Sequence, residues 1–176
     1  RQKDYWENYL KDGINYLDSF FDKPIFTKKK LQNINSISAS LNQNITKDLK
    51  SLANDFGVTF FVLLFFIYFI FIHKISEEDD ICIGLPVSNR DFLGGKELIG
   101  FFLNTILVKW NFNKDNYLKD SLLEFNKKFL EILKYKDYPF DELVRNFSNE
   151  SFFVNSPLVN MLFQFIENGD NKKNYN

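Results

Sequence analysis

Two short segments of this chain contain side chains whose types and spacing could support chemistry. The first, residues 98–109, places the amide of Asn104 inside an apolar, β-forming stretch. Burying an amide without hydrogen-bond partners costs on the order of 1–3 kcal/mol, so the fold must either satisfy Asn104 or use it. Two alternatives follow. The amide bonds a neighbouring loop, or it lines a cavity and donates to a carbonyl oxygen that gains negative charge during a reaction.

The second segment, residues 136–143, is an acidic, aromatic and proline-containing stop that restarts a helix. Asp137 and Asp141 flank Tyr138-Pro139-Phe140. Two carboxylates with an aromatic side chain between them could indicate acid–base chemistry. A turn and the capping of the following helix also explain both carboxylates, and we favour that interpretation.

Few other side chains are candidates for chemistry. His73 is the one histidine and ends an apolar helix, where a structural role is favoured over that of a catalytic base. Cys82 is the one cysteine and lies in a β-like run, as expected of an inert buried thiol. A single cysteine excludes an internal disulfide and a multi-cysteine zinc site, and we expect no metal. Arg90 is a loop guanidinium whose role composition leaves open.

Composition is that of an ordinary globular domain. The 176 residues are 45% hydrophobic and 26% charged, with a net charge of −1, so no basic surface suggests nucleic acid or an anionic membrane. Residues 1–12 are charged and amphipathic, which excludes a signal peptide there and predicts a cytoplasmic protein. The apolar run 58–72 is shorter than the roughly 20 residues that span a bilayer, so we expect a buried helix and no membrane contact.

Hydrophobic periodicity predicts alternating helices and strands along the chain. The expected helices are residues 4–21, a helix capped by Thr46 that ends before Gly57, residues 60–74 capped by Thr59, a long helix from Asn116, and a short one opened by Pro139. The expected strands are residues 36–41, 81–85, 102–110 and 158–166. Strands separated by helices predict an α/β domain, a mixed sheet with helices packed over it.

The motifs, in their order, resemble those of the condensation domains of nonribosomal peptide synthetases, which belong to the chloramphenicol-acetyltransferase-like superfamily. These domains carry an Ile/Val-Gly-x-Phe-Val-Asn-Thr motif, which resembles residues 99–105 of this chain. Further on they carry a Gln-Asp-Tyr-Pro-Phe-Glu motif, which resembles residues 136–141. The resemblance also includes Gly84-Leu85-Pro86-Val87-Ser88-Asn89-Arg90 and extends from Asp4 to about Glu167.

The resemblance implies a particular architecture. In the family, two lobes meet in a V, and a tunnel between them admits the phosphopantetheine arms of donor and acceptor carrier proteins. The first lobe bears a His-His-x-x-x-Asp-Gly motif, and this sequence has no adjacent histidines. It therefore resembles the second lobe alone, with residues 1–168 as the C-terminal lobe and residues 169–176 as a polar tail.

The resemblance also implies a function. Condensation domains form the amide bond between a carrier-bound acyl or peptidyl donor and a carrier-bound aminoacyl acceptor in peptide antibiotic biosynthesis. The implied partners are an N-terminal lobe, donor and acceptor peptidyl carrier domains and an adjacent adenylation domain. No cofactor is expected on this lobe, and no catalytic residue within it, so the isolated chain should be inactive. The alternatives are an O-acyltransferase of the same fold, a non-catalytic docking platform for carrier proteins or tailoring enzymes, and a scaffold without activity.

By position, Asn104 matches the family asparagine near the tunnel, with Thr105 and Phe102 flanking it. Arg90, Asp137 and Tyr138 are expected to support the neighbouring loops. Three departures from the family pattern stand out. Tyr135-Lys136 replaces the usual His/Asn-Gln, Lys109 stands where arginine is typical, and residues 151–155 barely resemble Arg-Asp-x-Ser-Arg. A lysine cannot reproduce a bidentate arginine contact.

Overall fold

The structure is a computed structural model that describes residues 1–15, 17, 36–90, 97, 99–100, 102–113, 115–147 and 158–166. Its elements, in chain order, are α1 (Gln2–Tyr9), α2 (Gln43–Asp55), α3 (Phe60–Ser76), β1 (Asp80–Ser88), β2 (Leu103–Asn111), α4 (Leu118–Leu133) and α5 (Phe140–Phe147). The expected tail, residues 169–176, lies outside the described residues.

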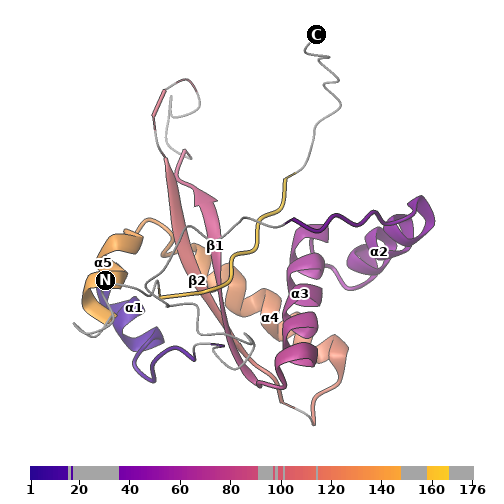
Figure 1. The fold of residues 1–176 in the computed structure, drawn as a ribbon, viewed down its shortest axis with the longest axis horizontal. Helices are drawn as coiled ribbons and strands as arrows, with labels where there is room; N and C mark the ends of the chain where they lie inside the picture. Colours follow the sequence, from indigo (N-terminus) through magenta and orange to yellow (C-terminus); the bar gives the residue numbers. More distant parts are fainter. Residues whose placement is uncertain are drawn as a thin grey trace.

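β1 and β2 form an antiparallel pair at the centre of the fold (Figure 1). The pairing runs from Asp80 opposite Asn111 to Ser88 opposite Leu103. Leu162 makes an isolated parallel bridge to Gly84 on the other side of β1. There the Gly84 N–H donates to the Met161 carbonyl at 3.0 Å, and the Phe163 N–H donates to the Gly84 carbonyl at 3.0 Å. The predicted α/β class is confirmed, although residues 158–166 form this bridge and not the regular strand we expected.

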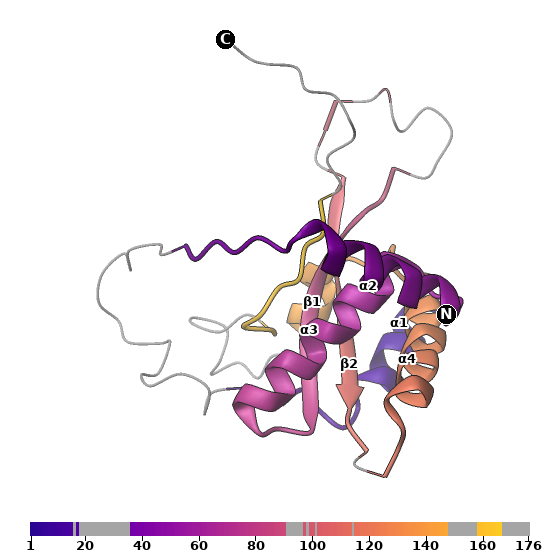
Figure 2. The same ribbon diagram turned by 90° about the vertical axis from the view of Figure 1, so that its right-hand side faces the viewer.

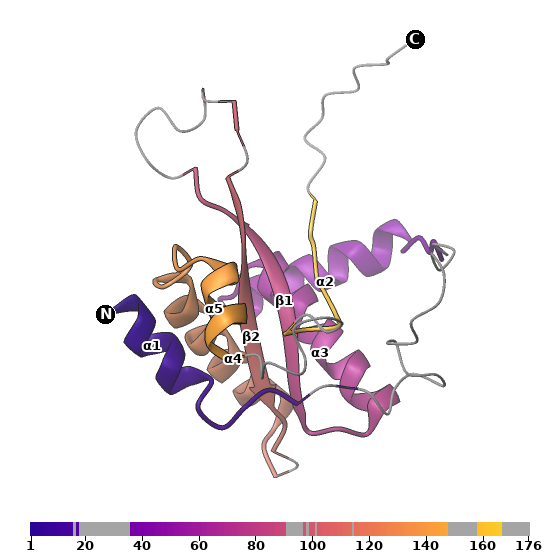
Figure 3. The same ribbon diagram turned by 60° about the vertical axis from the view of Figure 1, so that its left-hand side comes forward.

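The helices divide between the two strands. α3 packs against β1, whereas α4 and α5 pack against β2. α1 and α5 lie on the same side of the strand pair, next to β2 (Figure 3). α2 meets α3 at an angle of 105° and crosses the end of the layer that α3 forms (Figure 2). The result is a small sheet covered by helices.

Aromatic side chains fill the space between α3, α4 and the sheet. Phe65, Phe66 and Phe69 of α3 are almost completely inaccessible to solvent. Phe66 lies 5.3 Å from the ring of Phe125 on α4 and 6.0 Å from Trp110 on β2. Because α3 buries one side and leaves Phe71 on the other 54% exposed, it is the mostly buried helix that the apolar run predicted. In the described residues, no single helix is long and apolar enough to cross a membrane; α2 and α3 meet that test only as a bent pair.

The caps of two helices are visible in the structure. Thr59 caps α3, as predicted, by accepting a hydrogen bond from the Val62 N–H at 3.2 Å. α2, in contrast, is capped by Asn42, whose Oδ1 accepts from the Ile45 N–H at 2.8 Å. The prediction of Thr46 as the cap was wrong. Asn42 and Thr46 can both cap a helix, and the helix begins at the earlier of the two. The Thr46 hydroxyl instead donates back to the Asn42 carbonyl.

Two further predicted elements differ from the structure. Residues 36–42 are extended but pair with no strand in the described part, and Ile37 is 99% exposed. Alternating side chains therefore did not suffice for a half-buried strand, because such a strand also needs a partner ladder. α1 ends at Tyr9, well before the predicted residue 21, and Gly13 follows with a positive φ of 80°.

α1 covers the outer edge of β2. The Tyr9 hydroxyl accepts a hydrogen bond from the Lys109 N–H at 2.7 Å. Trp6 Nε1 donates to the Tyr135 carbonyl at 3.1 Å, and Tyr5 stacks on the Tyr135 ring at 3.7 Å. Tyr135, one of the residues that depart from the family pattern, therefore anchors α1 to the end of α4.

Replacing Gly84 with alanine should destabilise the fold. An added Cβ would lie 2.6 Å from Leu162 Cδ2 and 2.9 Å from Val159 Cγ2. We expect Gly84→Ala to lower the free energy of unfolding by about 1–3 kcal/mol, the usual cost of overpacking. Chemical unfolding followed by circular dichroism measures the loss. Leu162→Ala removes the nearer obstacle, so the double variant should recover part of it; an additive result would contradict the proposed clash.

Stability should fall as the pH rises above about 9. Burial raises the pKa of the Cys82 thiol from 9.0 to about 12, and burial raises the pKa of the Tyr9 hydroxyl as well. The unfolded chain therefore releases these protons at lower pH than the folded chain. Because deprotonation favours the unfolded chain, the free energy of unfolding decreases as the pH rises. Urea unfolding at pH 8 and pH 10.5 tests this, with Tyr9→Phe expected to reduce the difference. An equal stability at the two pH values would contradict it.

Candidate functional site

The side chain of Asn104 joins β2 to the turn between α4 and α5. Its Nδ2 donates to the Lys136 carbonyl at 2.7 Å and to the Tyr138 carbonyl at 2.8 Å. Its Oδ1 accepts from the Phe140 N–H at 3.0 Å. One half-buried amide thus satisfies three main-chain groups of the turn, including an N–H of the first turn of α5 that has no partner within the helix.

This geometry bears on the two alternatives for Asn104. The amide bonds a neighbouring loop, which is the structural alternative. Both Nδ2 hydrogens are used in doing so, and a direct donation to a substrate oxygen would require one of these bonds to break. The position of Asn104 beside a substrate tunnel stays a prediction.

The residues on either side of Asn104 do not form one constellation with it. Thr105 follows Asn104 on β2, so its side chain points to the opposite face of the sheet. Its Cγ2 there would lie 3.3 Å from a Cβ on Gly84. Phe102 precedes the strand, and its ring lies 4.4 Å from the guanidinium carbon of Arg90. Their assignment to a tunnel also stays a prediction.

Arg90 and Tyr138 make contacts that support local structure. Arg90 Nη2 donates to the Gly100 carbonyl at 3.1 Å and so joins the segments that leave β1 and enter β2. The Tyr138 hydroxyl accepts from Asn146 Nδ2 of α5 at 3.1 Å. Asp137 is exposed, whereas Asp141 lies in the first turn of α5, where the helix dipole favours a negative charge. This arrangement agrees with turn and helix-terminus roles for the two carboxylates.

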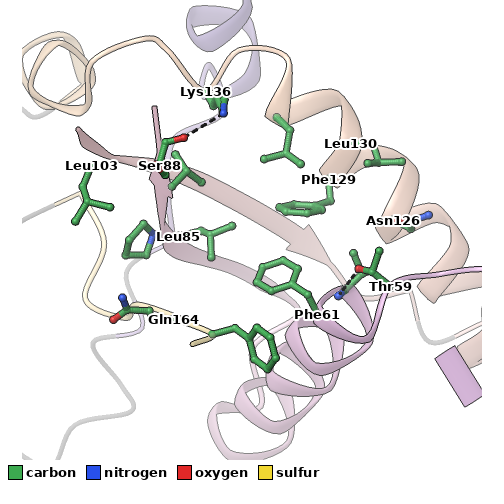
Figure 4. A pocket seen from close by; sticks show the side chains of 15 residues that line it. Thr59, Phe61, Leu85, Ser88, Leu103, Asn126, Phe129, Leu130, Lys136 and Gln164 are labelled. Atoms are coloured by element: carbon green, nitrogen blue, oxygen red, sulfur yellow. Dashed lines mark hydrogen bonds between the residues drawn. The ribbon is translucent and has the colours of Figure 1, made fainter. Parts of the chain in front are cut away.

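A cleft of about 590 Å³ opens beside this turn. Its walls come from the start of α3, the last turns of α4, the adjoining ends of β1 and β2, and residues 164–165 (Figure 4). Phe61 and Phe129 project into it with ring centres 5.6 Å apart. Lys136 closes one end, where its Nζ donates to the Ser88 carbonyl at 3.1 Å. Sequence patterns missed this cleft because its residues come from five separate segments.

The remaining candidates lie in structural surroundings. His73 Nδ1 is 2.8 Å from the Glu78 carbonyl oxygen, and the ring stacks on Phe112 at 4.4 Å. Cys82 is buried with a raised pKa, as expected for an inert thiol. Lys109 Nζ donates a hydrogen bond to the Gly13 carbonyl at 2.7 Å. In the described residues, no group of three or more His, Cys, Asp or Glu side chains is placed to hold a metal ion.

A family model described as the condensation domain matches residues 1–175. The chain belongs to the condensation-domain family. Among its relatives, gramicidin S synthase 2 of Brevibacillus brevis is 28% identical over 172 residues, which is 98% of this chain and 4% of that protein. Bacitracin synthase 3 of Bacillus licheniformis is 29% identical over 174 residues, 97% of this chain and 3% of that protein.

Solved condensation-domain structures share the fold. A four-domain nonribosomal peptide synthetase bound to AMP and glycine superposes with a TM-score of 0.81 at 22% identity, covering 92% of this chain and 12% of that one. The first condensation domain of the CDA synthetase gives 0.71 at 14% identity, covering 85% and 33%. This chain therefore spans about a third of a separately solved condensation domain and a few per cent of the synthetases.

Asn104→Ala should destabilise the turn between α4 and α5. The variant loses three hydrogen bonds, and we expect the free energy of unfolding to fall by about 1–3 kcal/mol. Asn104→Asp should be worse at neutral pH, because a carboxylate would face the Lys136 and Tyr138 carbonyl oxygens. Protonating the aspartate restores one donor, so its penalty should shrink at pH 4.

Asn111, exposed at the end of β2, provides the matched control. Asn111→Ala should change the free energy of unfolding by less than about 0.5 kcal/mol. Denaturant titration of all three variants at pH 7 and pH 4 makes the comparison. Equal stabilities for Asn104→Ala and Asn111→Ala would contradict the bonding role of Asn104.

Proposed function

We propose that this chain is the C-terminal lobe of a nonribosomal peptide synthetase condensation domain. The observation that carries the proposal is the direct bonding of the two family motifs to each other. Asn104 of the first motif holds the main chain of Lys136, Tyr138 and Phe140 in the second. The family-model match over residues 1–175 also supports the proposal, because the general function of this family is peptide bond formation between carrier-bound substrates.

The proposed reaction is an acyl transfer to nitrogen. The acceptor amine attacks the carbonyl carbon of the donor thioester, a C–N bond forms, and the C–S bond breaks. The sulfur leaves as a thiol, and the amine loses one proton. Both substrates are carried on phosphopantetheine by donor and acceptor carrier domains, and an adenylation domain supplies the acceptor. The protein acts in the cytoplasm in this proposal.

The lobe contributes position and not proton transfer. The family resemblance implies that a histidine of an N-terminal lobe would take the amine proton and return it to the leaving sulfur. The described residues of this chain offer no paired nucleophile and base. Asn104 fixes the turn that follows α4, and with it the Lys136 side chain at the end of the cleft. Asn104 would support this lobe's wall of the tunnel, with Arg90, Asp137 and Tyr138 in the loops behind it. Thr105 and Phe102 would act elsewhere, because Thr105 faces Gly84 and Phe102 lies against Arg90.

Single-turnover amide formation in the full-length protein tests the proposal. Wild-type protein with a loaded donor carrier and a loaded acceptor carrier should give an amide by mass spectrometry, and residues 1–176 alone should give none. Asn104→Ala should slow the reaction about tenfold or more because the turn loses its position, whereas Asn111→Ala should match wild type. The assay temperature is kept below the melting transition of each variant.

Other outcomes of this assay would indicate other functions. An ester formed with a hydroxyl acceptor in place of an amide would show an O-acyltransferase. Carrier binding without any acyl transfer would show a docking platform. Wild-type turnover in Asn104→Ala would remove this residue from the site.

A further inference from the structure

We propose that Tyr135 is a positioning residue for the reaction, because its ring ties the turn between α4 and α5 to α1. The inference rests on the proposed function, since the rate that it concerns is that of the proposed acyl transfer. Three observations support it: the stacking of the Tyr135 ring, the hydrogen bonds of its carbonyl, and the attachment of α1 to β2.

The ring of Tyr135 lies flat against α1. Its centre is 3.7 Å from the centre of the Tyr5 ring, and the two ring planes are inclined by 4°. Both side chains are half-buried. Stacked rings fix the separation and the tilt of the elements that carry them, because a displaced ring loses contact over its whole face. Histidine or asparagine is usual at position 135 in the family pattern, and an asparagine has no ring to stack.

The carbonyl of Tyr135 is the point at which α1 and the turn meet. It accepts a hydrogen bond from Trp6 Nε1 at 3.1 Å and another from the Tyr138 N–H at 3.3 Å. Trp6 is 1% exposed, so the core holds its indole in place. The carbonyl of Tyr138 accepts in turn from Asn104 Nδ2 at 2.8 Å. One peptide group therefore connects a buried side chain of α1 to a residue that Asn104 bonds.

The turn is held from two directions (Figure 3). Asn104 reaches it from β2, whereas Tyr5 and Trp6 reach it from α1. α1 is itself fixed to β2, because the Tyr9 hydroxyl accepts a hydrogen bond from the Lys109 N–H at 2.7 Å. Loss of the stack would remove one of the two attachments, and the turn beside the cleft would be placed less accurately. Small errors in the placement of reacting groups are costly in rate.

Amide formation in the full-length protein, with loaded donor and acceptor carrier domains, tests the inference. Tyr135→Ala removes the ring but keeps the carbonyl that Trp6 bonds. We expect this variant to lower kcat about tenfold and to leave KM for each carrier within about twofold of wild type, because a positioning residue acts on the reacting geometry. Tyr135→Phe keeps the stacked ring and should react within about twofold of wild type. Tyr135→His, with a smaller ring, should lie between the two.

A double-mutant cycle shows whether the effect passes through α1. Tyr5→Ala should lower kcat about as much as Tyr135→Ala, and the double variant little further, because both substitutions break the same contact. Tyr135→Leu, which keeps apolar bulk without a ring, replaces the alanine variant if that protein does not fold.

The matched control is Ile72→Ala, which removes core contacts from α3. Ile72 is 2% exposed and lies outside the cleft. This variant should lower the melting temperature at least as much as Tyr135→Ala and leave kcat within about twofold of wild type. Ile72→Val is the milder version if the alanine variant does not fold. All proteins are assayed below their melting transitions.

Hydrogen–deuterium exchange of the full-length protein measures the attachment of the turn directly. Peptides that cover residues 134–140 should exchange about tenfold faster in Tyr135→Ala than in wild type, because the turn opens more often once the stack is lost. Peptides that cover β1 should exchange at the wild-type rate. Tyr135→Phe should restore slow exchange in the turn.

The outcomes separate this inference from the proposed function. Unchanged exchange in Tyr135→Ala would overturn the attachment, and faster exchange with unchanged kcat would overturn the positioning role. A loss that appears in KM, an equal loss of kcat in Ile72→Ala, or independent losses that multiply to about a hundredfold in the double variant would also overturn it. In each of these cases wild-type protein still forms the amide. A wild-type protein that forms no amide would refute the proposed function, and the positioning role would fall with it.

Discussion

The fold depends on covering a pair of strands that could not persist alone. A two-stranded antiparallel ribbon is marginal in water, and β1 and β2 owe their stability to what packs against them. Phe66 of α3 and Phe125 of α4 close on Trp110 from β2 and make one aromatic core. The apolar composition of α3 is therefore a requirement of the small sheet, because its aromatic side chains cover the strands.

Asn104 transmits this packing to the candidate site. Its strand is held by the aromatic core, and its side chain bonds the turn between α4 and α5. The turn sets where α5 begins and where Lys136 stands relative to Ser88. Asn104, near the start of β2, thus fixes the polar turn beside the apolar cleft. Such an arrangement is expected of a site that orients a mostly hydrophobic ligand.

Sequence patterns identified the elements whose signal is local. The apolar run predicted α3 and its Thr59 cap, and the continuous hydrophobic stretch predicted β2. Residues 36–42 show the limit, because alternation carries no information about a partner strand. The same holds for the site. An interrupting Asn104 was visible in the sequence, but its three bonds to a turn more than thirty residues away, and the cleft assembled from five segments, depend on tertiary packing.

The contact between α1 and β2 has a consequence for how larger assemblies can form. The Tyr9 hydroxyl occupies the Lys109 N–H, one of the main-chain donors that an added strand would use at the outer edge of β2. On the other side of β1, the main chain of Gly84 is already bonded to Met161 and Phe163. A strand added at Lys109 or at Gly84 would therefore have to displace a contact that is already made there.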